Sequence, residues 1–375
     1  MKKHAIIPIF IPHQGCPNDC VFCNQRNITA RTLIPGADDV RATIEKYLPT
    51  LTGRGLETIE VAFFGGSFTG LDIDLQSMYL SVAKEYKDKG LISKIHLSTR
   101  PDYINTQILD NLKHYSVDII ELGVQSFDEE VLRLSNRGHS INCVYKSSLL
   151  IKKYGFELGL QLMIGLPGDC LEKDLFSARE LVQIGPSIAR LYPTIVIKDT
   201  QLNEMYLAGN YQPLTQEEAV HITKEMYKII SDAGINIIRV GLKSTDVIND
   251  SDRGAIAGGT FHPAFRQLVE GEIAKDMLEC QLMEFFSKSG ANRGKVKTDE
   301  KIETDKIIET DKIIKTDEKI ETVYFCSRNE SFSNMVGNNK INKKYFADRF
   351  PCVKIEYIID NSIGLNTYIL KEEMK

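Results

Sequence analysis

Three cysteines near the start of the chain constrain its structure more than any other feature. They lie in the segment Gly15-Cys16-Pro17-Asn18-Asp19-Cys20-Val21-Phe22-Cys23, with the spacing C-x3-C-x2-C. A short loop with this spacing can direct three thiolates toward one metal centre. Closely spaced cysteines of this kind hold iron–sulfur clusters. A [4Fe–4S] cluster has four irons, so three cysteine ligands leave one iron open to another molecule.

Other uses of three clustered cysteines fit the sequence less well. A structural zinc site normally takes four ligands, and no second C-x2-C or H-x3-H pair occurs in the sequence. A disulfide framework needs an even number of cysteines, and the opening residues do not resemble an export signal. The remaining cysteines are scattered, as is typical of small buried side chains, and they form no local group for a second cluster: Cys143, Cys170, Cys280, Cys326 and Cys352.

The composition excludes several broad classes of protein. The 375 residues suit two or three domains, or one large barrel with an appendage. Hydrophobic residues make up 42% and the net charge is −5, which argues against a strongly basic nucleic-acid-binding surface. The sequence contains no run of about 18 apolar residues, so no membrane span is expected. Cysteine usage without an export signal predicts a reducing compartment, the cytoplasm.

Strand-like apolar runs alternate with amphipathic stretches from Ala5 to about Val240. Repeated βα units of this kind predict an α/β fold with a parallel sheet and right-handed crossovers. The predicted strands are Ala5–Ile11, Thr58–Phe64, Lys94–Ser98, Asp118–Val124, Glu157–Ile164, Ile188–Ile197 and Ile235–Val240. The predicted helices are Asp38–Leu48, Leu75–Lys87, Thr106–His114, Glu129–Tyr154, Leu171–Ile184 and Gln216–Ala233, the last with a capping box formed by Thr215 and Glu218.

The alternation of strand-like and helix-like segments ends after Thr245. A polar loop and a helix (Phe265–Ser287) are expected in 246–297, and 298–321 repeats the hexad TDEKIE, TDKIIE, TDKIIK, TDEKIE. Neither a helix nor a strand would bury much of this repeat, so a solvated insertion without a catalytic role is expected. Residues 322–375 are predicted to form a small α+β unit with a short helix at Lys343–Arg349 and strands at Val353–Ile359 and Asn366–Leu370. The predicted organisation is therefore a core at 1–245 followed by these three segments.

A series of short motifs follows the cysteines in a fixed order. It comprises Gly65-Gly66-Ser67-Phe68-Thr69, Ser98-Thr99-Arg100-Pro101-Asp102-Tyr103, Glu121-Leu122-Gly123-Val124-Gln125-Ser126, Arg137-Gly138-His139, Gly165-Leu166-Pro167-Gly168 and Tyr192-Pro193-Thr194. With the cysteine loop, this series resembles the radical SAM superfamily, in particular the radical SAM domain of the Elongator subunit 3 group, and more distantly the oxygen-independent coproporphyrinogen oxidases. The resemblance covers roughly Ile6 to Val240 and implies an open (β/α)6 partial TIM barrel.

The resemblance also implies the cofactors and their ligands. Cys16, Cys20 and Cys23 would hold a [4Fe–4S] cluster whose open iron binds the amino and carboxylate groups of S-adenosylmethionine (SAM). The turn Gly65-Gly66-Ser67 would contact the methionine amino group. Taken alone, this turn is explained equally well as a tight βα connection or as a place where a ligand approaches the backbone.

Further SAM contacts are implied at the ends of later strands. Gln125 and Ser126 would face the ribose and methionine, and Arg137 would pair with the SAM carboxylate, which suits a planar bidentate cation. Without the resemblance, Arg137 would be interpreted as half of a surface salt bridge. Ser98 and Gln161 stand where related sequences carry an acidic residue facing SAM. No catalytic residue is assigned beyond the cluster ligands.

The class implies reductive cleavage of SAM and hydrogen abstraction from a substrate, with electrons from a reductant protein such as flavodoxin or ferredoxin. The Elongator-like group acts on tRNA, which makes a tRNA base the leading substrate. That group also carries an acetyltransferase domain, of which no Gly-rich acetyl-CoA loop is visible after Thr245. The segment Asn338–Lys344, next to Tyr345 and Phe346, would either contact phosphates and stack a base or form a solvated helix face.

Three alternative functions remain open on the sequence alone. The first is a radical SAM oxidase or decarboxylase of a small molecule such as a porphyrin. The second is a non-catalytic Fe–S sensor or electron carrier, although such carriers prefer four protein ligands. The third is a zinc-stabilised RNA-binding module.

Overall fold

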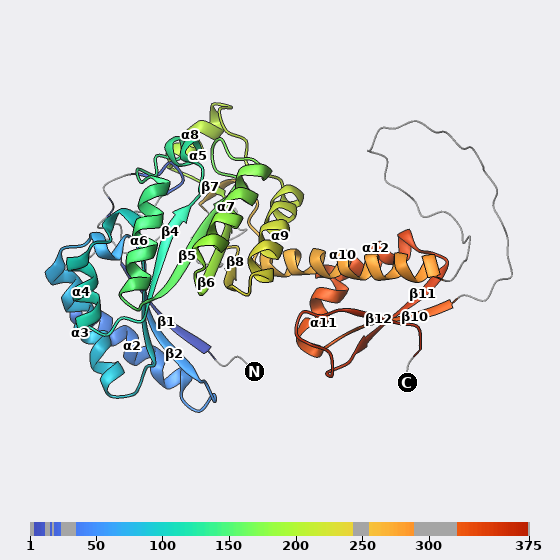
Figure 1. Ribbon diagram of the computed structural model, residues 1–375, viewed down its shortest axis with the longest axis horizontal. Coiled ribbons are helices and arrows are strands. Elements are labelled where there is room, and N and C mark those ends of the chain that lie inside the picture. The colour runs from blue at the N-terminus through green and yellow to red at the C-terminus, as the bar shows by residue number, and fades with distance from the viewer. Residues whose placement is uncertain are drawn as a thin grey trace. The chain divides into compact units, whose positions relative to one another are not determined.

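Two compact units make up the chain, Met1–Phe265 and Arg266–Lys375 (Figure 1). The computed structural model describes residues 4–11, 16, 19–23, 35–242, 255–288 and 321–373. Most of the hexad repeat, residues 298–320, lies outside the described residues, as does the predicted boundary at Thr245.

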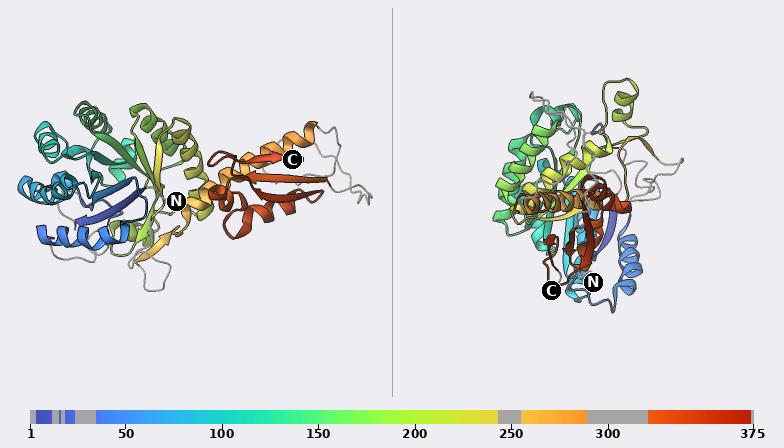
Figure 2. Two further views of the ribbon diagram at one scale, coloured as in Figure 1. Left: turned by 90° about the horizontal axis from the view of Figure 1, so that it is seen from below. Right: turned by 90° about the vertical axis from the view of Figure 1, so that its right-hand side faces the viewer.

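The first unit is built on a seven-stranded sheet in which every neighbouring pair is parallel. The order β1-β2-β3-β4-β5-β6-β8 follows the chain, and the sheet curls into the predicted partial barrel, with a seventh strand beyond the six implied by the resemblance (Figure 2). The strands are β1 (His4–Ile11), β2 (Thr58–Gly65), β3 (Lys94–Thr99), β4 (Ile119–Gln125), β5 (Glu157–Ile164), β6 (Ile188–Pro193) and β8 (Asn236–Val240).

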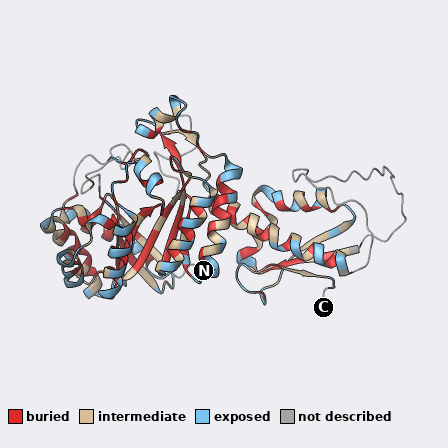
Figure 3. Cartoon of the chain, turned by 45° about the horizontal axis from the view of Figure 1, so that its top comes forward, coloured by how far each residue is buried: buried red, intermediate tan, exposed pale blue. Residues whose placement is uncertain are grey.

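Six helices of this unit lie around the outside of the curled sheet (Figure 2): α2 (Ala37–Leu51), α3 (Ile73–Asp88), α4 (Thr106–His114), α6 (Ile141–Lys153), α7 (Leu171–Ile184) and α9 (Gln216–Asp232). Two short helices, α5 (Glu129–Leu134) and α8 (Gln201–Leu207), lie beyond the ends of the strands (Figure 1). The predicted capping box is present, because Thr215 Oγ1 accepts the Glu218 N–H while the Glu218 carboxylate accepts the Thr215 N–H. The strands between these helices are largely buried, as Figure 3 shows.

The predicted strand Ile188–Ile197 is wrong in extent. β6 ends at Pro193, and a separate strand β7 (Ile195–Ile197) pairs antiparallel with β9 (Ile256–Gly259) in a second small sheet. Proline cannot donate a ladder hydrogen bond, so the chain can leave the large sheet at this point. β9 itself lies in a region that the sequence predicted as loop.

The predicted single helix Glu129–Tyr154 is also wrong, because it is broken into α5 and α6. Asn136 (φ 51°) and Gly138 (φ 79°) adopt left-handed backbone conformations that an α-helix cannot contain. The second helix then starts afresh, since Ser140 Oγ accepts the Cys143 N–H as an N-cap. This break places Arg137 and His139 in a connection rather than on a helix face.

The inner face of the sheet carries a chain of ionisable side chains, all of them buried except His4 at its edge. His96 Nδ1 lies 3.4 Å from Glu60 Oε2, and its Nε2 lies 3.5 Å from Glu121 Oε2. Glu121 Oε2 also accepts a hydrogen bond of 2.7 Å from Arg190 Nε, and His4 Nε2 lies 3.0 Å from Glu60 Oε1. These pairs link β1, β2, β3, β4 and β6 across the interior of the partial barrel.

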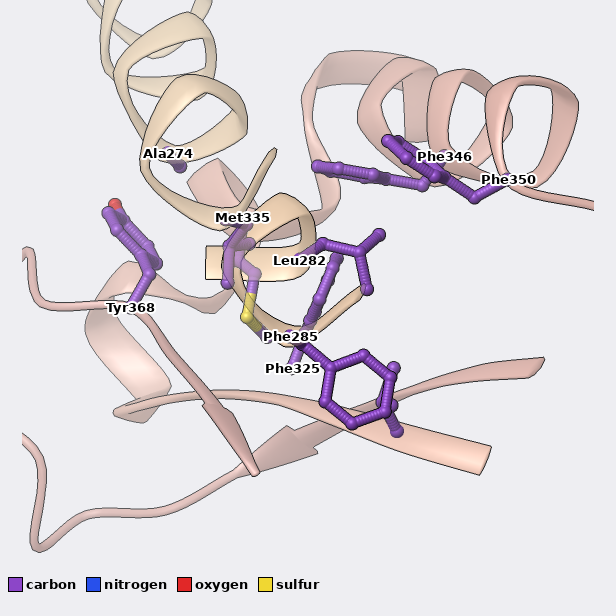
Figure 4. Close-up of a cluster of buried hydrophobic side chains, with 10 residues drawn as sticks. Ala274, Leu282, Phe285, Phe325, Met335, Phe346, Phe350 and Tyr368 are labelled. Carbon is purple, nitrogen blue, oxygen red and sulfur yellow. The ribbon is translucent and has the colours of Figure 1, made fainter. Parts of the chain in front are cut away.

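The second unit has its own sheet and hydrophobic core. Its elements are α10 (Phe265–Lys288), which begins on the last residue of the first unit, β10 (Glu321–Ser327), α11 (Asn329–Val336), α12 (Ile341–Arg349), β11 (Val353–Ile359) and β12 (Ile369–Lys371). The sheet has the order β11-β10-β12. Figure 4 shows aromatic side chains of this core, among them Phe325, Phe346 and Phe350, packed with Leu282 and Met335.

The predicted elements of the second unit are present, with one shortened strand. α10, α12 and β11 match the predictions closely, whereas the predicted strand Asn366–Leu370 shrinks to β12 because Asn366 has a left-handed backbone (φ 55°). No helix in the described part of the chain is long and apolar enough to cross a bilayer.

Candidate functional site

The described part of the cysteine loop is fastened to the first unit on both sides. The Val21 N–H donates to Ser135 O (3.1 Å), and Val21 O accepts from the Leu202 N–H (2.7 Å). On the first side, Asn136 Nδ2 also donates to Asp19 O (2.9 Å). The buried Val21 side chain adds to this attachment by packing against Leu202.

The three cysteines are unevenly exposed. Cys20 is buried, with 7% of its surface exposed, and Cys16 and Cys23 are half-buried. Cys16 Sγ lies 3.4 Å from Ser67 Oγ, and Cys20 Sγ lies 3.5 Å from Arg137 Nη1. Within the described ranges, no group of three or more His, Cys, Asp or Glu side chains lies close enough together to hold a metal ion.

The donor set nevertheless fits an iron–sulfur cluster. Soft thiolates are the ligands that such clusters take, and an anionic metal–thiolate group is favoured by nearby cations. The buried Arg137 guanidinium supplies such a cation beside Cys20. Its exposed fraction of 6% also excludes the surface salt bridge that the sequence alone would suggest.

The glycine turn is brought to the cysteine loop by the pairing of β1 with β2. Gly65 pairs with Ile11 at the end of both strands, and the Gly66 N–H donates to Ile11 O (3.1 Å). Ser67 follows directly and contacts Cys16. Gly65 has φ +113°, and a Cβ at this position would lie 2.3 Å from Ile11 O. Gly65 is therefore required for the close approach of β2 to the Ile11 carbonyl, whether or not a ligand binds at the turn.

Replacing Gly65 with alanine is expected to lower the free energy of unfolding by about 2–5 kcal/mol, through backbone strain and a clash with a carbonyl oxygen that cannot move away. Denaturant unfolding measures the loss. Gly53→Ala is the matched control, because Gly53 also has positive φ (+77°) but a Cβ added there would meet no heavy atom within 4 Å. The control should cost only about 1–2 kcal/mol, and equal losses in both variants would contradict the clash.

Two of the predicted SAM-facing side chains meet between the last residue of β4 and the middle of β5. Gln161 Nε2 donates to Gln125 Oε1 (3.1 Å), and Gln125 has an unusual positive φ of 73° beside an irregularity in the β4–β5 pairing. Such backbone conformations for non-glycine residues cluster at functional sites. Ser98 is half-buried on β3, two residues after His96 and thus on the same face of the sheet.

Ser126 has a local structural contact instead. Its Oγ accepts the Asp128 N–H (3.1 Å) and lies 3.4 Å from Ser177 Oγ on α7. The predicted site residues therefore meet as three pairs, Ser67 with Cys16, Arg137 with Cys20, and Gln125 with Gln161, whereas Ser126 contacts the α7 side.

Arg100 lies near Cys20 and Cys16, and Asp102 and His139 lie near Arg100; the sequence left the roles of these three residues open. Arg100 is buried and donates from Nε (2.9 Å) and Nη2 (2.8 Å) to the Asp102 carboxylate. Burial alone would lower the pKa of Arg100, but the Asp102 carboxylate and, to a lesser extent, negative charge on the sulfurs of Cys20 and Cys16 raise it above its usual value. Burial and the positive charges of Arg137 and Arg100 lower the pKa of His139 to about 3, so this imidazole is neutral at physiological pH.

A pair of carboxyl groups lies just beyond β5. Asp174 is buried, Asp169 is half-buried, and the Asp169 Oδ1 accepts the Cys170 N–H (3.0 Å). Burial raises the pKa of Asp169 to about 6, and burial together with the neighbouring Asp169 carboxylate raises that of Asp174 still further. The pair therefore retains a proton at neutral pH and caps the Gly165–Asp169 turn.

The aromatic residues considered for base stacking in the second unit are engaged elsewhere. Phe346 is fully buried in the core shown in Figure 4. The Tyr345 hydroxyl contacts Glu279 (2.9 Å), and Lys275 lies over its ring. These contacts favour a solvated helix face over a base-stacking surface at Asn338–Lys344.

Comparisons with known proteins agree with this geometry. Residues 10–176 match the model of the radical SAM superfamily, and residues 186–275 match that of the radical SAM C-terminal domain. A tRNA uridine(34) acetyltransferase of Methanocaldococcus infernus is 28% identical over 317 residues, which cover 74% of this chain and 58% of that protein. Elongator complex protein 3 of Schizosaccharomyces pombe is 34% identical, covering 60% and 49%. The chain thus spans about half the length of these curated relatives.

A solved structure of the archaeal Elp3 from Methanocaldococcus infernus, with an N-terminal deletion, shares the fold. The two structures superpose with a TM-score of 0.58 at 23% identity, over 75% of this chain and 65% of that one. The resemblance indicated by the ordered motifs is confirmed by these matches, and so is the partial barrel.

Proposed function

Because the chain belongs to the radical SAM superfamily, we propose that it is an enzyme that cleaves SAM reductively and abstracts hydrogen from a substrate. The observation that carries this proposal is the convergence on the cysteine loop of Ser67 from the glycine turn and Arg137 from the α5–α6 connection. Two of the three cysteines, Cys16 and Cys20, thus have a residue of the glycine turn or a buried cation beside the sulfur atom, which supports a cluster and SAM bound at this loop.

Each group in the site has a proposed task. Cys16, Cys20 and Cys23 would hold a [4Fe–4S] cluster, which supplies, when bound, the electron that splits SAM into methionine and a 5′-deoxyadenosyl radical. The turn Gly65–Ser67 would orient the methionine amino group through its backbone. The remaining proposed SAM contacts are side chains on or just after β3, β4 and β5, together with Arg137: Ser98, Gln125, Ser126, Gln161 and Arg137.

We further propose that the substrate is a tRNA base and that a small reductant protein such as flavodoxin or ferredoxin supplies electrons in the cytoplasm. Relatives named as tRNA uridine(34) acetyltransferases support the choice of tRNA. The names of these relatives specify uridine 34 of tRNA, so the proposed substrate can be tested by changing the base at that position.

Anaerobically reconstituted protein with dithionite and SAM should form 5′-deoxyadenosine, measured by chromatography. A tRNA transcript with uridine at position 34 should increase this rate, whereas a matched transcript with cytidine there should not. Equal rates with both transcripts would rule out recognition of that base. Absence of 5′-deoxyadenosine from protein that holds a full cluster and binds SAM, with or without tRNA, would reject the enzyme and favour an Fe–S sensor.

A further inference from the structure

Arg137 is held in one position by contacts at both ends of the residue. Its backbone N–H donates to Leu132 O (2.9 Å), and its Nη2 donates to Gly123 O (2.6 Å) at the end of β4. A Cβ on Gly123 would lie 3.0 Å from Arg137 Nη2, so a glycine here leaves room for the guanidinium. The guanidinium is therefore fixed by the fold before any cofactor binds.

The same guanidinium points a donor at a sulfur atom. Arg137 Nη1 lies 3.5 Å from Cys20 Sγ, which is within the range for a hydrogen bond to sulfur. Both side chains are buried, so water screens the interaction little. The charge of the other buried arginine near these cysteines, Arg100, is balanced by its ion pair with Asp102, which leaves Arg137 as the cation that contacts Cys20.

Resting on the function proposed above, we propose that Arg137 is a positioning residue that donates an N–H···S hydrogen bond to the Cys20 thiolate and raises the reduction potential of the cluster. Hydrogen bonds to the ligating sulfurs and the local charge are among the factors that set cluster potentials. Reduction adds a negative charge, and a fixed cation beside the sulfur stabilises the reduced state more than the oxidised state. This role differs from pairing with the SAM carboxylate, because it operates without SAM.

The two roles are separated by measuring the cluster without SAM. Arg137→Gln removes the charge, and its midpoint potential in an EPR-monitored titration should fall by at least about 59 mV, a tenfold change in the one-electron equilibrium. Arg137→Lys keeps the charge and should recover part of the shift. Arg133→Gln is the matched control, because Arg133 is an exposed arginine on the preceding helix α5, and its potential should equal that of the wild type.

An unchanged SAM-free potential in Arg137→Gln would overturn the proposal, and a weakened SAM affinity alone would assign Arg137 to the carboxylate. If the glutamine variant folds but holds too little iron for titration, Arg137→Lys replaces it: the lysine keeps the charge but loses the guanidinium donor to Cys20, so its potential should lie below that of the wild type, and an equal potential would overturn the proposal. Iron content and thermal midpoints of each variant identify any loss of fold. Since no SAM is present, the result does not depend on whether the protein cleaves SAM.

Discussion

A Cys20→Ala variant is expected to lose SAM cleavage completely while keeping the fold. Cys20 is the most buried of the three cysteines and the one that Arg137 contacts. Removing a metal ligand should lower activity by more than about 100-fold, because changes to the groups around a metal ligand already cost 10–100-fold. The backbone bonds of the loop run through Asp19 and Val21, so the loop should stay attached without the thiol.

Formation of 5′-deoxyadenosine and iron per chain are the two readouts for Cys20→Ala. Cys352→Ala is the matched control, since Cys352 is an exposed cysteine in the second unit. The control should retain full iron and activity. Retained SAM cleavage by the Cys20 variant would contradict the assignment of the cluster to this loop.

The fold was largely predictable because its signals are local. Each strand of the large sheet is a short apolar run, and each crossover helix has its own amphipathic pattern, so alternation alone predicts a parallel sheet. The errors arose where tertiary contacts decide the structure. β7 leaves the sheet because a partner, β9, comes from a segment about 60 residues later in sequence. The break between α5 and α6 depends on Asn136 adopting a conformation that the sequence only permits.

The candidate site was predictable in its parts and less so in its pairings. The order of the motifs identified Cys16, Ser67 and Arg137, but their contacts depend on the ends of separate elements meeting at one edge. The buried charges of the barrel interior had a weaker signal: single ionisable residues within apolar strands, such as His96 and Glu121. Which of these groups pair depends on the strand order of the folded sheet, because Glu60 and His96 lie on the neighbouring strands β2 and β3, whereas Arg190 on β6 reaches Glu121 on β4 across β5.

His96 joins two buried glutamates, and its loss is expected to be strongly destabilising. In His96→Leu, Glu60 and Glu121 would lose a shared cationic neighbour, and breaking a buried ion pair costs about 3–5 kcal/mol. Equilibrium unfolding in urea measures this loss. His221→Leu is the matched control, because His221 is exposed on α9 and should change stability by less than about 0.5 kcal/mol.

The loss should also depend on pH in a defined direction. Burial alone would raise the pKa of Glu60, yet hydrogen bonds from His4 and His96 lower it to about 2, so its contribution to stability is present above the unfolded value of about 4.3 and fades below it. Burial would lower the pKa of His96, but Glu121 and Glu60 raise it, so its contribution is full below about 6.5 and declines at higher pH. The difference between wild type and His96→Leu should therefore be largest between about pH 4.5 and 6.5 and smaller on either side. If the difference in unfolding free energy stayed constant from pH 3 to 9, His96 would act through packing. An electrostatic contribution must change with pH, because it requires a charged imidazole and ionised glutamates.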